Sequence, residues 1–157
     1  GDLSYPVRGI RTRDFLYLWN LRPDRWPVGD PELYHSVGAY GDVDLSPLKD
    51  LLVGGAGRAD LAPFRALSLE RRSPEELYDL RTDPHQIRNL AADPAYAEQR
   101  RELRERVQRW MRETGDPRVD PAYDGWDAMP YFGPPAKAAA DATKGKDAKS
   151  KRRPAAP

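Results

Sequence analysis

The longest periodic stretch of the sequence is DPAYAEQRRELRERVQRWMRETGDP, residues 93–117. Asp93 and Pro94 supply a helix cap and a first-turn proline, and Gly115 supplies a stop. Four apolar side chains between these limits recur at helical spacing: Tyr96, Leu103, Val107 and Trp110. We therefore predict a helix over residues 94–114, about 30 Å long, that buries this stripe against a sheet.

The sheet is predicted from four short runs of strand-forming residues upstream of the helix. Residues 6–11 and 15–21 are rich in branched and aromatic side chains and flank a polar turn, which is typical of a β-hairpin. Residues 64–70 and 76–80 give two further strands, and residues 83–90 give a short helical turn. The predicted fold class is α+β, with a small antiparallel sheet of about four strands packed by one long C-terminal helix.

Two segments lack such patterns. Residues 22–63 are dense in Pro, Gly and Asp and are predicted to form a long loop with a short helix at residues 48–53. A loop of this length is uncommon in a compact domain and is often functional. Residues 134–157 are rich in Ala, Lys and Pro without apolar periodicity, which predicts a disordered basic tail. The predicted domain therefore spans residues 1–133.

The composition limits the kinds of site. The 157 residues contain no cysteine and two histidines, which excludes disulfides, thiolate metal sites and His-rich metal sites. No apolar run approaches the ~20 residues of a membrane-spanning helix. The sequence begins with Gly1 rather than Met and has no signal-peptide pattern, from which we expect a piece of a longer protein.

Several phrases of the sequence stand in a characteristic order. They are YPVR (residues 5–8) with RGIRTRDFLY (8–17), EELYDL (75–80), DPH (83–85), NLA (89–91) and TGDPR (114–118). In this order they resemble the C-terminal subdomain of formylglycine-dependent sulfatases, in particular the N-sulfoglucosamine sulfohydrolase (heparan N-sulfatase)-like group and its bacterial relatives. The resemblance extends over residues 5–133.

The resemblance implies an activity that belongs to a larger assembly. This subdomain is normally appended to an alkaline-phosphatase-like α/β catalytic domain, which here would lie on the same or a separate polypeptide. That domain would carry a nucleophile made from Cys or Ser in a Cys/Ser-x-Pro-x-Arg motif, and a calcium ion. The reaction would be hydrolysis of a sulfate ester or N-sulfate on a carbohydrate, with this chain completing the fold and rimming the active-site cleft. A periplasmic or secreted location is also implied.

No catalytic or metal-binding residue is predicted on this chain itself. Ser4, Pro6 and Arg8 formally fit Ser-x-Pro-x-Arg, but the small residue before the arginine and the Leu-Thr/Ser-Gly after it are missing. These positions are also accounted for by the entrance to the hairpin. His85 is expected to be a turn or interface residue.

The candidate substrate-binding residues lie on the long loop, in DPELYH (residues 30–35) and GDVDLSPLK (41–49). They are His35, Asp42, Asp44, Ser46 and Lys49. Bacterial sulfatases show a similar GDxDxSPTK phrase, and polar or cationic loop groups can reach a sulfated sugar bound by another domain. The alternative is a solvated loop whose Asp and Ser side chains form turn hydrogen bonds.

A second interpretation of the whole chain is a non-enzymatic interaction module. Residues 136–157 carry seven Lys and Arg against two Asp, so that the remainder of a chain of net charge +1 is negative. The basic tail and an exposed sheet would then bind an anionic partner. The body contains no nucleic-acid recognition motif, so no nucleic-acid partner is predicted.

Overall fold

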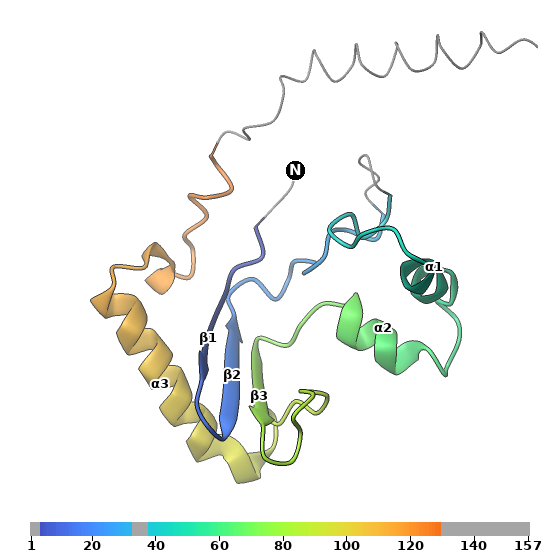
Figure 1. Ribbon diagram of the computed structural model, residues 1–157. Coiled ribbons are helices and arrows are strands. Elements are labelled where there is room, and N and C mark those ends of the chain that lie inside the picture. The colour runs from blue at the N-terminus through green and yellow to red at the C-terminus, as the bar shows by residue number, and fades with distance from the viewer. Residues whose placement is uncertain (1–3, 33–37, 130–157) are drawn as a thin grey trace, which may run out of the picture. The chain divides into compact units, whose positions relative to one another are not determined.

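The computed structural model describes residues 4–32 and 38–129. Its first element is the predicted hairpin, formed by strands β1 (Val7–Arg11) and β2 (Phe15–Asn20), which pair antiparallel (Figure 1). The turn is fixed by Thr12, whose Oγ1 accepts a hydrogen bond from the Phe15 amide at 2.9 Å. The hairpin prediction is confirmed to within one residue at each end.

The third strand, β3 (Glu75–Asp79), pairs antiparallel with β2, so that the described sheet has the order β1-β2-β3. The fourth predicted strand, residues 64–70, is wrong because this segment forms helix α2 (Ala62–Ser68). Its backbone closes hydrogen bonds of helical spacing, from the Arg65 amide to the Leu61 carbonyl at 2.9 Å and from the Leu69 amide to the Arg65 carbonyl at 2.8 Å. Among the residues that the structure describes, the sheet therefore has three strands.

The predicted C-terminal helix is confirmed as a 3-10 turn, η1 (Pro94–Tyr96), followed by α3 (Ala97–Glu113). The Asp93 carboxylate accepts a hydrogen bond from the Ala95 amide at 3.0 Å, as a cap should. Gly115 follows the helix with φ 67, in the left-handed region that favours glycine.

One residue of the predicted apolar stripe is not in the core. Trp110 is 52% exposed, and the helix buries Leu103, Val107 and Met111 instead. At about 100° per residue, three residues spaced by four span a narrow arc centred on Val107, and Trp110 lies about 60° to one side of that centre. In the sequence, Trp110 widens the apolar stripe to one side. The pattern alone does not show which side of the stripe faces the sheet.

The main core lies between α3 and one face of the sheet. Alternate strand residues point to this face, and Tyr17 and Leu77 are fully buried there against Leu103, Val107 and Met111. Partly buried Phe15 and Trp19 complete the same row on β2. The residues between them, Leu16, Leu18 and Asn20, therefore point to the opposite face.

Residues 83–90 form turns rather than the predicted helical turn. The Asp83 carboxylate does accept amide hydrogen bonds, from Ile87 at 3.1 Å and Arg88 at 2.8 Å. However, Gln86 has φ 53, which a right-handed helix does not allow. The segment then rejoins β3, where the Leu90 amide bonds to the Leu77 carbonyl at 2.8 Å.

The long loop contains the predicted short helix, α1 (Pro47–Gly54), and it packs with α2 around a second small core of Tyr40, Leu52 and Leu69. A short 3-10 turn, η2 (Pro117–Val119), follows α3. Within the described residues, no helix is both long and apolar enough to cross a membrane. The predicted tail, residues 134–157, lies outside the described residues, as does the boundary after residue 133.

Candidate functional site

The phrase GDVDLSPLK ends at the start of α1, and two of its candidate residues hold the loop together. Ser46 is the N-cap, and its Oγ accepts a hydrogen bond from the Lys49 amide at 3.2 Å. The Lys49 side chain is buried, and its Nζ donates to the carbonyl oxygens of Tyr40 at 2.9 Å and Val43 at 2.8 Å. The lysine side chain thus folds back onto its own loop. A sulfate could bind its ammonium group only by displacing these two carbonyl oxygens.

The other candidates differ in exposure. Asp42 and Asp44 are exposed on the same loop, and His35 lies outside the described residues. The fold therefore brings Asp42, Asp44, Ser46 and Lys49 onto one short loop, with the two carboxylates directed to solvent. Binding of a sulfated substrate by this group stays a prediction.

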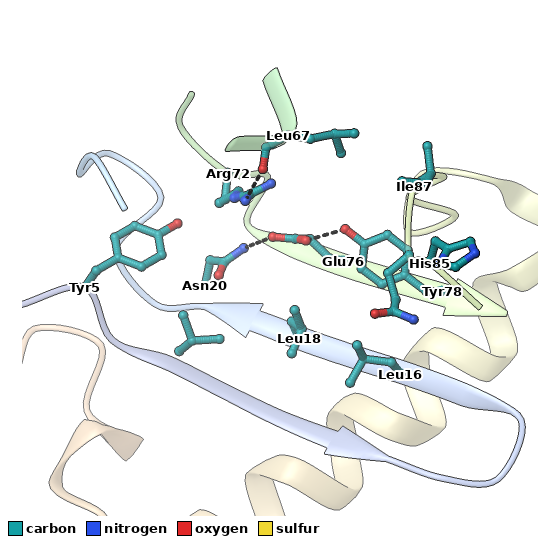
Figure 2. Close-up of a pocket in the computed structure, with 12 residues that line it drawn as sticks. Tyr5, Leu16, Leu18, Asn20, Leu67, Arg72, Glu76, Tyr78, His85 and Ile87 are labelled. Carbon is teal, nitrogen blue, oxygen red and sulfur yellow. Dashed lines mark hydrogen bonds between the residues drawn. The ribbon is translucent and has the colours of Figure 1, made fainter. Parts of the chain in front are cut away.

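A hollow that the sequence did not indicate lies on the face of the sheet that α3 leaves uncovered (Figure 2). Its volume is about 410 Å³. Its floor is apolar and includes Val7, Leu16 and Leu18, while Leu67 of α2 and the residues 85–87 stand at its sides. We call this hollow the sheet cavity.

A row of polar side chains lies along β2 and β3 in the sheet cavity, as Figure 2 shows. Glu76 accepts hydrogen bonds at both carboxylate oxygens, from Asn20 Nδ2 at 2.7 Å and from the Tyr78 hydroxyl. All three residues are buried. Burial, followed by the bond to the Glu76 carboxylate, raises the pKa of Tyr78 well above its ordinary value, so the phenol stays protonated as a donor.

Further polar groups line the sheet cavity. The Arg72 guanidinium donates to the Leu67 carbonyl, which ties the rim to α2. The Tyr5 hydroxyl is buried and has no hydrogen-bond partner among the described residues. Burial, and next the negative charge of Glu76, raise the pKa of Tyr5. His85, predicted as a turn or interface residue, is exposed at the edge of this cavity.

No family model matches the chain. It is 32% identical over 120 residues to human N-sulphoglucosamine sulphohydrolase, a match that covers 74% of this chain and 22% of the relative. It is 29% identical over 118 residues to an ulvan-active sulfatase of Formosa agariphila, covering 70% of this chain and 17% of that protein.

The chain is similar to a sulfatase C-terminal region. This sulfatase-like chain spans about a fifth of the length of the curated relatives it matches. The sequence-based resemblance to a sulfatase C-terminal region is thereby confirmed.

In this sulfatase-like chain, the Ser-x-Pro-x-Arg pattern at Ser4 is part of a cluster that joins the two ends of the described chain. The Ser4 hydroxyl accepts from Arg118 Nη2 at 2.9 Å, and its amide donates to Asp127 at 2.8 Å. Arg8 forms an ion pair with Asp116, and Arg25 forms one with Asp127 at 2.7 Å. The hydroxyl and the guanidinium of the pattern are therefore both engaged in holding the chain ends.

Sequence reasoning had no means of finding the sheet cavity as a whole. The alternation in EELYDL does place Glu76 and Tyr78 on one side of a strand and Leu77 on the other. What the sequence did not reveal is which side α3 covers and that Asn20 faces Glu76 across the strands. The available signal was a charged residue, Glu76, at a strand position next to the apolar Leu77.

Proposed function

We propose that this chain is the C-terminal part of a sulfatase that hydrolyses a sulfate ester or an N-sulfate on a carbohydrate. It packs against a catalytic domain, completes the fold and contributes to the rim of the active-site cleft. The nucleophile and the calcium site belong to that other domain, and this chain supplies no catalytic group. The similarity to two sulfatases, one named for N-sulphoglucosamine and the other for ulvan, carries this proposal.

Exposed apolar surface supports the packing role. On and around α1 and α2, four large side chains face solvent: Leu45 is 73% exposed, Leu48 63%, Leu51 45% and Phe64 59%. Leu48 and Leu51 are three residues apart on α1 and so lie on the same side of that helix, and contiguous exposed apolar surface typically marks an interface. The partner of this surface is, in our proposal, the catalytic domain.

The loop that carries GDVDLSPLK has a divided role within this proposal. Ser46 and Lys49 hold the loop in shape, and Asp42, Asp44 and His35 contact the sugar. Carboxylates suit the hydroxyl groups of a carbohydrate, because each oxygen accepts a hydrogen bond from a sugar hydroxyl. In this proposal, cationic groups of the catalytic domain bind the sulfate.

The test begins with the reading frame upstream of Gly1. We expect it, or a neighbouring frame, to encode Cys/Ser-x-Pro-x-Arg and a metal-binding Asp-Asp pair. The complete protein should then release sulfate from an N-sulfated glucosamine or from ulvan, and replacing the motif Cys or Ser with Ala should abolish this release.

Two further measurements separate the parts of the proposal. The chain alone should release no sulfate from an aryl sulfate, and turnover that Ser4→Ala abolished would overturn the assignment of chemistry to another domain. In the complete protein, Asp42→Asn with Asp44→Asn should raise KM and leave kcat nearly unchanged, since rim contacts bind ground state and transition state alike. An unchanged KM would remove these residues from the substrate site.

A further inference from the structure

Glu76 in the sheet cavity is a buried carboxylate without an ionic partner in the described part of the chain. It is 6% exposed, and its two hydrogen-bond donors, Asn20 and Tyr78, are neutral. Its neighbour Glu75 points to the other face and lies 3.5 Å from Arg104 and 4.0 Å from Arg100. A buried charge is normally paired, because desolvation of an unpaired carboxylate is costly.

The surroundings of Glu76 leave room for a cation. Arg72 lines the same cavity, but its guanidinium is bonded to the Leu67 carbonyl and forms no ion pair with Glu76. The Tyr5 hydroxyl offers a second polar group without a partner among the described residues.

We propose that the sheet cavity receives an arginine side chain, flanked by apolar residues, from the catalytic part of the sulfatase. The guanidinium pairs with the Glu76 carboxylate and donates to the Tyr5 hydroxyl, which its several N–H groups allow. The apolar neighbours of the arginine cover Leu16 and Leu18. A volume of about 410 Å³ is within the range of pockets that bury small-molecule ligands, which are larger than one arginine side chain.

Two observations favour this occupant. The sulfatase relatives are several times longer than this chain, so most of their length is available to supply a docking segment. The cavity also combines an apolar floor with a carboxylate, Glu76, that forms no ion pair with a described residue, while the Arg72 guanidinium of the same cavity is bonded to the Leu67 carbonyl. An arginine between apolar residues complements both the floor and the carboxylate. The inference rests on the proposed function, because it names the partner of the face that α3 leaves uncovered.

The complete chain is titrated with acetyl-Leu-Arg-Leu-amide and followed by amide NMR shifts. The matched probe is the same peptide with citrulline, which keeps the shape of arginine without its charge. We expect the shifts to concentrate at Leu16, Leu18 and Glu76, and the citrulline peptide to bind about tenfold more weakly. Equal binding of the two peptides, or shifts centred on α1 and α2, would overturn the proposal.

Variants on the same strand provide the control. Glu76→Gln should remove the preference for the arginine peptide, whereas Glu75→Gln, on the opposite face, should retain it. A Glu76→Gln variant that still prefers arginine contradicts the proposal. The comparison of the two peptides on the unmodified chain needs no variant, so a folding defect in either variant leaves the test intact.

The failure of this inference is distinguishable from the failure of the proposed function. If the complete protein releases sulfate but the chain does not discriminate between the peptides, the docking inference alone is wrong. If the upstream frame encodes no sulfatase motif and the arginine peptide still binds at Glu76, the sulfatase proposal is wrong and the cavity is a site for another basic segment. In the complete sulfatase, Glu76→Gln should also increase proteolytic separation of the two parts, and Glu75→Gln should not.

Discussion

The two faces of the sheet differ in how completely this chain covers them. Under α3, Tyr17 and Leu77 have no exposed surface, and Glu75 lies near two arginines. On the other face, Leu18 is partly exposed and Glu76 forms no ion pair with a described residue. Because Glu75 and Glu76 are neighbours on one strand, the difference arises from what packs on each face. One face is completed by the chain itself, and the other has the character of an interface.

The largest expected effect is on the covered face. Leu103→Ala should lower the free energy of unfolding by about 2–5 kcal/mol, through lost transfer energy and the cavity left behind. That is a large share of the about 5–15 kcal/mol that holds a domain folded. Leu18→Ala on the open face should cost about 1 kcal/mol or less. Urea unfolding measures both, and equal midpoints would show that the faces do not differ.

Acid should weaken the ion pairs that tie the chain ends to the sheet. Hydrogen bonds from Arg8 lower the pKa of Asp116 below its ordinary value, against the opposing effect of burial. A carboxyl group with a lowered folded pKa stabilises the fold above its unfolded pKa of about 3.9, and this stabilisation is lost as pH falls through the folded pKa. We therefore expect the melting temperature to fall as pH drops below about 4.

The matched variant is Asp116→Asn, which should be less stable at neutral pH by about 1–3 kcal/mol because a hydrogen bond to a charged group is lost. Its melting temperature should then depend less steeply on pH below about 4 than that of the unmodified chain. The exposed Asp44→Asn is the control. An identical acid slope in Asp116→Asn and the unmodified chain would mean that this ion pair does not stabilise the fold.

The two glutamates of β3 should respond to neutralisation in different directions. Glu75→Gln loses its proximity to Arg100 and Arg104 and weakens the bond from the Tyr17 hydroxyl, at a cost of about 1 kcal/mol. Glu76→Gln removes a buried charge that has no described ionic partner. Asn20 can still donate to the amide oxygen and the Tyr78 hydroxyl can accept from the amide N–H, so the isolated chain should keep its stability or gain some. Chemical denaturation of the two variants gives the sign directly. A larger loss in Glu76→Gln would contradict the contrast between the faces.

Trp110→Ala should change the free energy of unfolding by no more than about 0.5 kcal/mol. Its side chain is half exposed, and Ala is the better helix former. The apolar pattern alone predicts that this variant would largely unfold the chain. The measurement therefore decides between the prediction from the sequence pattern and the prediction from the packing in the structure. Met111→Ala is the comparison, because Met111 is fully buried on the next position of the helix. Equal losses of unfolding free energy in the two variants would show that Trp110 contributes to the core as much as Met111 does.

The elements that local sequence determines were predicted well. The hairpin, β3, α1 and the long helix each have a cap, a turn or a period that a short window contains. The strand predicted at residues 64–70 failed because its apolar residues are compatible with either period and only Leu69 packs inward. The prediction for Trp110 failed because Trp110 and Met111 point about 100° apart around the helix, and it is Met111 that is buried.

The candidate site depends on contacts between distant residues, and sequence reasoning reached it least. Lys49 reads as a free cation on a polar loop, yet its ammonium is held by two carbonyls of that loop. Asn20 and Glu76 are 56 positions apart and meet only because β2 and β3 pair in this register. The family resemblance implies a partner domain, but it does not show which face of the sheet that domain covers.

The smallest expected effect is that of removing residues 136–157. This segment has no apolar periodicity, so its removal should leave the melting temperature of the chain unchanged. The segment is also basic, and a basic tail placed on the open face would pair with Glu76 and complete that face from within the chain. Truncation would then lower the melting temperature, and the loss would be absent when Glu76→Gln is already present. If the effects of truncation and Glu76→Gln on the melting temperature are additive, the open face remains available to a partner. If the two effects are coupled, the chain covers both faces of its own sheet.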